Sequence, residues 1–183
     1  MAKKKIGKPK WSDVKPGVAG LDHKGVVALV SDLYALSKDN RDFLHTRFDP
    51  AADPLAPYKE IIHDCMYPDV MRNRPIQIAK AKRAISAYSK AAGTPLGEAE
   101  LMTFFVECGN QFTVDYGDID EGFYDALIRM YVRAVERTLE LPEPEREAFR
   151  QRLEEIAKSS SGIGWGYHDG LCDEYYEAFP DDG

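Results

Sequence analysis

The sequence predicts an all-α fold of about seven to eight helices in antiparallel hairpins, arranged as a compact bundle or a short superhelical array. Three observations support this prediction. Apolar residues recur at steps of three and four along most of the chain. No segment alternates polar and apolar residues between turns, as a half-buried strand does. Proline and glycine separate the helical segments by short connections, which make successive helices antiparallel neighbours.

The ordered part of the chain is expected to begin near residue 21. Lysine, glycine and proline dominate residues 1–20, which we predict to be a basic flexible arm. Residues 21–183 are predicted to form a single helical domain. Asp22 is a good helix N-cap, and apolar residues follow it at helical spacing.

Caps and prolines predict where the helices begin and end. Thr94 followed by Pro95 is a good start signal, because proline fits the first helical turn. Asp118 with Glu121 forms an N-cap and acid pair before the sixth helix. In chain order, the expected helices run from Asp22 through Tyr34, from Asp39 to Phe48, from Pro54 or Pro57 to Cys65, from Pro75 to Gly93, from Thr94 through Phe112, from Asp118 through Leu139, through Phe149 to Ile156, and through Leu171 to Phe179.

The composition is typical of a soluble globular protein, with 44% hydrophobic and 30% charged residues. No apolar run reaches the roughly 20 residues of a membrane helix. The basic start lacks the apolar stretch of a secretory signal. Cys65, Cys108 and Cys172 form no CxxC pair and are expected to be free thiols. We therefore expect a soluble, cytoplasmic protein that contacts no membrane.

Charge is divided unevenly between the two halves of the chain. Residues 1–95 carry 17 Lys and Arg against 10 Asp and Glu, whereas residues 96–183 carry 7 against 21. Such a division can mark an interaction surface. Basic and acidic helices that pack side by side explain it more simply, and we prefer that interpretation.

The segment 159–170 is the most unusual in the sequence, because it holds four glycines, three of which alternate with large side chains, among them Trp165 and Tyr167, before a His-Asp pair. The spacing GxGxG follows a helix, so it is neither a dinucleotide-binding loop nor a P-loop. The simpler interpretation is a tight turn that buries Trp165 and caps the last helix with Asp169. The functional interpretation is a pocket with Trp165 as its wall and His168 as a titratable group.

A second unusual segment, 115–121, holds four carboxylates that could bind a divalent cation. Its ligand spacing is not that of an EF-hand. Capping of the next helix is the simpler explanation, and it leaves Asp115 and Asp120 without a role. A pairing of Asp115 with His168 would join the two unusual segments into one site.

Two other functions are compatible with parts of the sequence. A metal-dependent hydrolase could use His168 and Asp169 with the acids of 115–121. The residue order of HD-type phosphohydrolases also occurs here, in His45, His63, Asp64 and Asp115. Nucleic-acid binding could use the basic 72–90 face, although the sequence pI of about 5.2 favours a solvated helix face instead.

The motifs Asp-Tyr-Gly-Asp-Ile (115–119) and Gly-Trp-Gly-Tyr-His-Asp (164–169) resemble those of a family of uncharacterised, mostly bacterial proteins, a domain of unknown function. The similarity extends from about residue 22 onward and includes the segment 33–40. It implies a helical domain without implying an activity. His63 and Asp64 do not belong to the family pattern. The residues to which the resemblance draws attention are Tyr116, Asp118, Trp165, His168 and Asp169.

Together these observations predict a cytoplasmic binding or interaction module without a cofactor or metal, whose partner is a protein or a small ligand. The prediction depends on the segments 115–121 and 162–170 coming together. The candidate binding residues are Asp115, Tyr116, Asp118, Trp165, Tyr167, His168 and Asp169.

Overall fold

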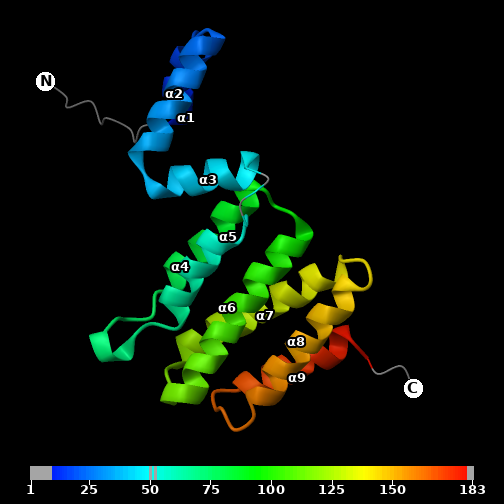
Figure 1. Ribbon diagram of the computed structural model, residues 1–183. Coiled ribbons are helices and arrows are strands. Elements are labelled where there is room, and N and C mark those ends of the chain that lie inside the picture. Colours follow the sequence, from blue (N-terminus) through cyan, green and yellow to red (C-terminus); the bar gives the residue numbers. More distant parts are fainter. Residues whose placement is uncertain (1–9, 50, 52, 181–183) are drawn as a thin grey trace, which may run out of the picture. The chain divides into compact units, whose positions relative to one another are not determined.

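The computed structural model describes residues 10–49, 51 and 53–180, and these ranges contain helices and no strand, which confirms the predicted all-α class (Figure 1). One short 3-10 helix, η1, lies between the fourth and fifth α-helices. The elements are α1 (Trp11–Ala19), α2 (His23–Leu36), α3 (Lys38–Phe48), α4 (Ala56–Met66), η1 (Val70–Arg72), α5 (Ile78–Ala91), α6 (Pro95–Tyr116), α7 (Glu121–Leu139), α8 (Glu145–Ser159) and α9 (Tyr167–Ala178).

The chain divides into two compact units, unit 1 (Met1–Leu44) and unit 2 (His45–Gly183). The division falls inside α3, whereas the sequence placed a boundary at residue 20. The arm predicted for residues 1–20 is wrong for residues 11–19, which form α1. Trp11, Val14 and Val18 follow helical spacing there, and the proline and glycine content concealed it. The rest of the predicted arm, residues 1–9, lies outside the described residues.

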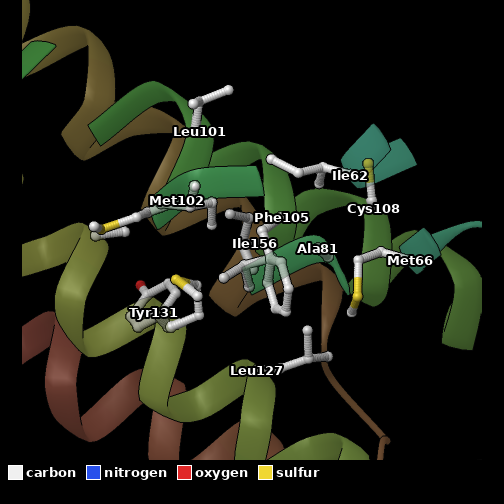
Figure 2. Close-up of a cluster of buried hydrophobic side chains, with 14 of the residues drawn as sticks. Ile62, Met66, Ala81, Leu101, Met102, Phe105, Cys108, Leu127, Tyr131 and Ile156 are labelled. Carbon is white, nitrogen blue, oxygen red and sulfur yellow. The ribbon is translucent and has the colours of Figure 1, made fainter. Parts of the chain in front are cut away.

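Helix α6 lies at the centre of unit 2 and packs on α4, α5, α7 and α8, while α9 packs on α7 and α8 (Figure 1). Of the 22 residues of α6, 13 are buried. Figure 2 shows Phe105 of α6 and Leu127 and Tyr131 of α7 among the side chains buried at this centre. A helix surrounded by four others needs apolar residues on most of its sides, which is what α6 provides.

Helices α6 and α7 approach each other closely at Gly109. A Cβ atom added there would collide with the side chain of Leu127. Glycine at this position therefore lets the larger leucine of α7 fill the space beside the backbone of α6.

The predicted start of α6 is confirmed, whereas the predicted cap of α7 is wrong. Thr94 Oγ1 accepts a hydrogen bond from the N–H of Gly97 at 3.2 Å. Asp120, and not Asp118, caps α7 by accepting from the N–H of Phe123 at 2.9 Å. The chain leaves α6 through Gly117 at φ 90°, which is accessible to glycine, and needs three more residues before α7 can begin.

A network of ion pairs joins α4, α6 and α8. Lys59 Nζ lies 2.6 Å from Glu100, which also binds Arg152. The same guanidinium donates to Glu107, from Nε at 2.8 Å and from Nη2 at 2.9 Å. Cations from two neighbouring helices thus neutralise two carboxylates of α6.

The three cysteines are free, as predicted. Within the described ranges, no helix combines the length and the apolar character needed to cross a membrane.

Candidate functional site

The two unusual segments come together at one contact. Trp165 Nε1 donates to Asp118 Oδ2 at 3.2 Å. The other oxygen of Asp118 accepts from the hydroxyl of Tyr124 at 2.7 Å. Tyr124 belongs to α7, so the carboxylate links the indole of the 162–170 segment to a buried residue of the core. The orientation of the Asp118 side chain is therefore fixed at both oxygens.

Trp165 has a backbone conformation that is uncommon for its residue type. Its φ is 61°, in the left-handed region, and its side chain is 56% exposed. Gly162 and Gly166 on either side also have positive φ, and open space surrounds the position of a Cβ at each of them. Strained residues of this kind are concentrated at functional sites. The simpler interpretation of the sequence, in which Trp165 is buried, is wrong.

Tyr167 occupies the buried position instead. Its side chain is fully buried, and its ring lies 5.1 Å from that of Tyr124. Burial raises the pKa of its hydroxyl, which has no hydrogen-bond partner among the described residues. Of the predicted candidates, Tyr167 is therefore a core residue that a ligand cannot reach. Only Gly166 separates Tyr167 from the exposed Trp165. Its φ of 67° reverses the direction of the chain between the two side chains.

Asp115 faces a different set of residues from Asp118. It accepts from the hydroxyl of Tyr67 at 2.7 Å and from Gln111 Nε2 at 2.9 Å. These bonds lower the pKa of Asp115, and the bond to Asp115 is the largest cause of the raised pKa of Tyr67. The neighbouring Tyr116 is half exposed and its ring lies 4.9 Å from that of Phe112.

His168 is held by the end of α8. Its Nδ1 lies 2.9 Å from Ser160 Oγ and 3.1 Å from the carbonyl oxygen of Ala157. Ser160 is fully buried and itself donates to the carbonyl of Ala157. The histidine ties α9 to α8, and the pairing of His168 with Asp115 that would have completed one site is not formed within the described ranges.

Asp169 is exposed in the first turn of α9, where a carboxylate stabilises the positive end of the helix. The prediction that Asp169 caps α9 is wrong. The helix begins at Tyr167, after Gly166 in the left-handed conformation, so Asp169 already lies inside it. Its role in the structure is thus electrostatic.

Residues 10–49, 51 and 53–180 contain no group of three His, Cys, Asp or Glu side chains placed to hold a metal ion. In this part of the chain, the metal-dependent hydrolase considered as an alternative therefore has no set of three side chains that could bind its metal ion.

A groove between α4 and α6 was not anticipated from the sequence. It has a volume of about 300 Å³ and is lined by His63, Tyr67, Glu107, Cys108 and Gln111. We name it the α4–α6 groove. The available signal was a pair of i,i+4 spacings, one on each helix, which place His63 beside Tyr67 and Glu107 beside Gln111. Nothing in the sequence alone brings the two pairs together.

Comparison with models of known protein families, with curated proteins and with solved structures found no match. The resemblance to a family of uncharacterised helical proteins stays a prediction. The geometry of unit 2 is therefore the basis for interpreting its sites.

Proposed function

We propose that this protein is a cytoplasmic binding module that docks a protein partner on the surface around Trp165 and Asp118. The observation that carries this proposal is the exposed indole, held in a left-handed backbone conformation with its N–H bound to a fixed carboxylate. Tryptophan is enriched among the residues that dominate binding energies in protein interfaces. An aromatic side chain that is already oriented loses little conformational entropy when a partner binds.

The charge next to the indole favours a basic segment of the partner. Both hydrogen-bond donors to Asp118, Trp165 and Tyr124, are neutral, and the described residues place no cation against this carboxylate. Its negative charge is therefore uncompensated. A lysine or arginine over the face of an indole gains cation–π attraction, which an adjacent carboxylate reinforces.

The experiment uses the fact that the chain contains two tryptophans, Trp11 and Trp165. In the variant Trp11→Phe, tryptophan fluorescence, excited beyond the absorption of the ten tyrosines, reports on Trp165 alone. We expect lysine- and arginine-rich peptides to change this emission saturably, and glutamate-rich peptides of the same length to have no effect. Adding Asp118→Asn should weaken the response to basic peptides.

The matched control is Trp165→Phe, which retains Trp11 as its fluorophore and should not respond to the basic peptides. If the Trp11→Phe protein responds equally to acidic and basic peptides, or to neither, the proposed docking surface is wrong.

Nucleic-acid binding is a second candidate because of one observation in the basic 72–90 segment. Burial, and then the neighbouring Arg129 and Arg133 of α7, lower the pKa of Lys82. Lys82 thus lies near Arg133 and near Arg129, which is paired with Asp125 at 3.3 Å, and a phosphate backbone would relieve the remaining repulsion. Retention of the protein on a DNA or RNA column at low salt, reduced in Lys82→Gln, would support this candidate. Flow-through at low salt would exclude it.

A further inference from the structure

We propose that the α4–α6 groove binds a small organic cation, namely a primary amine attached to a single aromatic or apolar ring. This proposal is independent of the docking surface at Trp165. The groove volume of about 300 Å³ lies at the lower end of the range for ligand pockets. A ligand of about one ring with a short polar arm fits that volume.

The polar groups that line the groove offer hydrogen-bond acceptors. The hydroxyl of Tyr67 and Nε2 of Gln111 both donate to Asp115, so each uses a proton in that bond. A lone pair of the Tyr67 hydroxyl, which also interacts with Tyr116, and the amide oxygen of Gln111 remain as acceptors for a ligand, and the Gln111 amide keeps one further N–H. Glu107 contributes a carboxylate, which accepts only. A ligand that donates several hydrogen bonds matches this lining better than one that accepts them.

The charge around the groove also favours a cation. Arg152 neutralises Glu107 with two hydrogen bonds. Asp115 accepts only from the neutral Tyr67 and Gln111, and the described residues place no cation against it. Asp115 is not part of the lining, but it is bonded to the lining residues Tyr67 and Gln111, so its negative charge lies next to the groove and an ammonium group would compensate it.

The remaining walls are the faces of two rings and a buried thiol. The rings of His63 and Tyr67 lie 5.6 Å apart at an interplanar angle of 37°. Cys108 is buried, and burial raises the pKa of its thiol to about 12, so the thiol is neutral and contributes an apolar surface. Aromatic walls favour a ring, and the face of Tyr67 attracts a cation.

The lining is held in place by hydrogen bonds within the chain. Asp115 joins Tyr67, at the end of α4, to Gln111 of α6, and Arg152 of α8 fixes Glu107. Side chains that are already oriented lose little entropy on binding, which favours recognition of even a small ligand. Asp115 is thus a positioning residue for the groove as well as its source of charge.

The test is calorimetric titration of the full chain with three probes of one shape, which are benzylamine, benzyl alcohol and benzoate. At neutral pH they are a cation, a neutral molecule and an anion. We expect saturable binding of benzylamine at millimolar concentrations, weaker binding of benzyl alcohol and none of benzoate. Binding of benzylamine should weaken as salt is added, because screening reduces the attraction between exposed charges.

Two variants assign the binding to this groove. Asp115→Asn removes the uncompensated charge, and Gln111→Leu removes the free amide oxygen. Each should weaken benzylamine binding by about tenfold or more, while Asp173→Asn, an exposed carboxylate on α9, should leave it unchanged. Thermal unfolding of each variant shows whether it is folded.

Three outcomes would overturn the proposal. One is that benzylamine does not bind. Another is that benzoate binds as tightly as benzylamine. The third is that a folded Asp115→Asn protein keeps the affinity of the natural chain for benzylamine.

Discussion

Units 1 and 2 are both made of helices with regular apolar spacing, but among the described residues the buried core lies in unit 2. Helices α1 and α2 of unit 1 contain no buried residue, and Leu33 of α2 is 44% exposed. Leu127 of α7 in unit 2 is fully buried. The comparison teaches that apolar periodicity predicts a helix and its apolar face, whereas neighbouring helices decide whether that face is buried. An exposed apolar face of this kind is typical of a surface that binds something else.

The largest expected effect tests this difference directly. Leu127→Ala should lower the free energy of unfolding by about 3 to 5 kcal/mol, because it removes a buried side chain and leaves a cavity. Leu33→Ala, the same change on α2, should lower it by less than about 0.5 kcal/mol, since the side chain is already in contact with solvent. Urea unfolding monitored by circular dichroism measures both. Equal losses in the two variants would show that unit 1 buries Leu33 after all.

The second prediction concerns the ion pairs that hold unit 2 together. Burial raises the pKa of Glu100, but hydrogen bonds from Arg152 and Lys59 outweigh it, and the pKa is lowered from 4.5. A lowered pKa in the folded state means that this stabilisation is present above pH 4.5 and is lost as the pH falls through the folded pKa. Glu100→Gln should cost about 1.5 to 3 kcal/mol at neutral pH.

The pH dependence supplies the control for that variant. The loss of stability between neutral pH and the acid region should be smaller in Glu100→Gln than in the natural chain. The exposed carboxylate variant Glu155→Gln should follow the natural chain. Parallel pH curves for the natural chain and Glu100→Gln would contradict the assignment.

A third prediction compares two buried tyrosines of unit 2. Replacing each by phenylalanine should change the stability of the protein in opposite directions. The hydroxyl of Tyr131 donates to the carbonyl of Leu153 at 2.9 Å, so Tyr131→Phe should destabilise the protein by about 1 kcal/mol. The hydroxyl of Tyr167 lacks a partner in the described chain, so Tyr167→Phe should raise stability by about 1 kcal/mol. Thermal unfolding distinguishes the two. A destabilised Tyr167→Phe would show that its hydroxyl has a bound partner such as water.

The smallest expected effect concerns an exposed aromatic side chain of unit 2 that resembles those of unit 1. Trp165→Gly removes a large side chain but also relieves the left-handed strain, so stability should change by less than about 0.5 kcal/mol. Chemical unfolding measures this change. A loss of several kcal/mol would mean that Trp165 supports the fold, and the docking surface would lose its main evidence.

Helix starts were predictable from the sequence where one residue and its neighbours determine them. Thr94 and Pro95 are such a case, because the cap and the proline both act within one turn. The choice between Asp118 and Asp120 was not predictable, since it depends on the backbone of Gly117, which local composition does not reveal. Two equally good capping residues can be separated only by the path of the chain.

The candidate site was predictable in part. The sequence placed Trp165 and Asp118 in the right segments, and the structure brings their side chains together. It could not tell which of Trp165 and Tyr167 is buried, because both alternate with glycine in a segment without periodicity. The α4–α6 groove could not be predicted from the sequence. His63 and Glu107 lie on different helices, and only the packing of α4 on α6 makes them neighbours.

The close approach of α6 and α7 has a consequence for evolution. Gly109 leaves the space that the side chain of Leu127 fills, so neither residue can change size freely. A homologous chain with alanine or a larger residue at 109 should carry a smaller side chain at 127. These two positions are therefore expected to covary among homologues, and they offer a means of recognising distant relatives that share this helix pair.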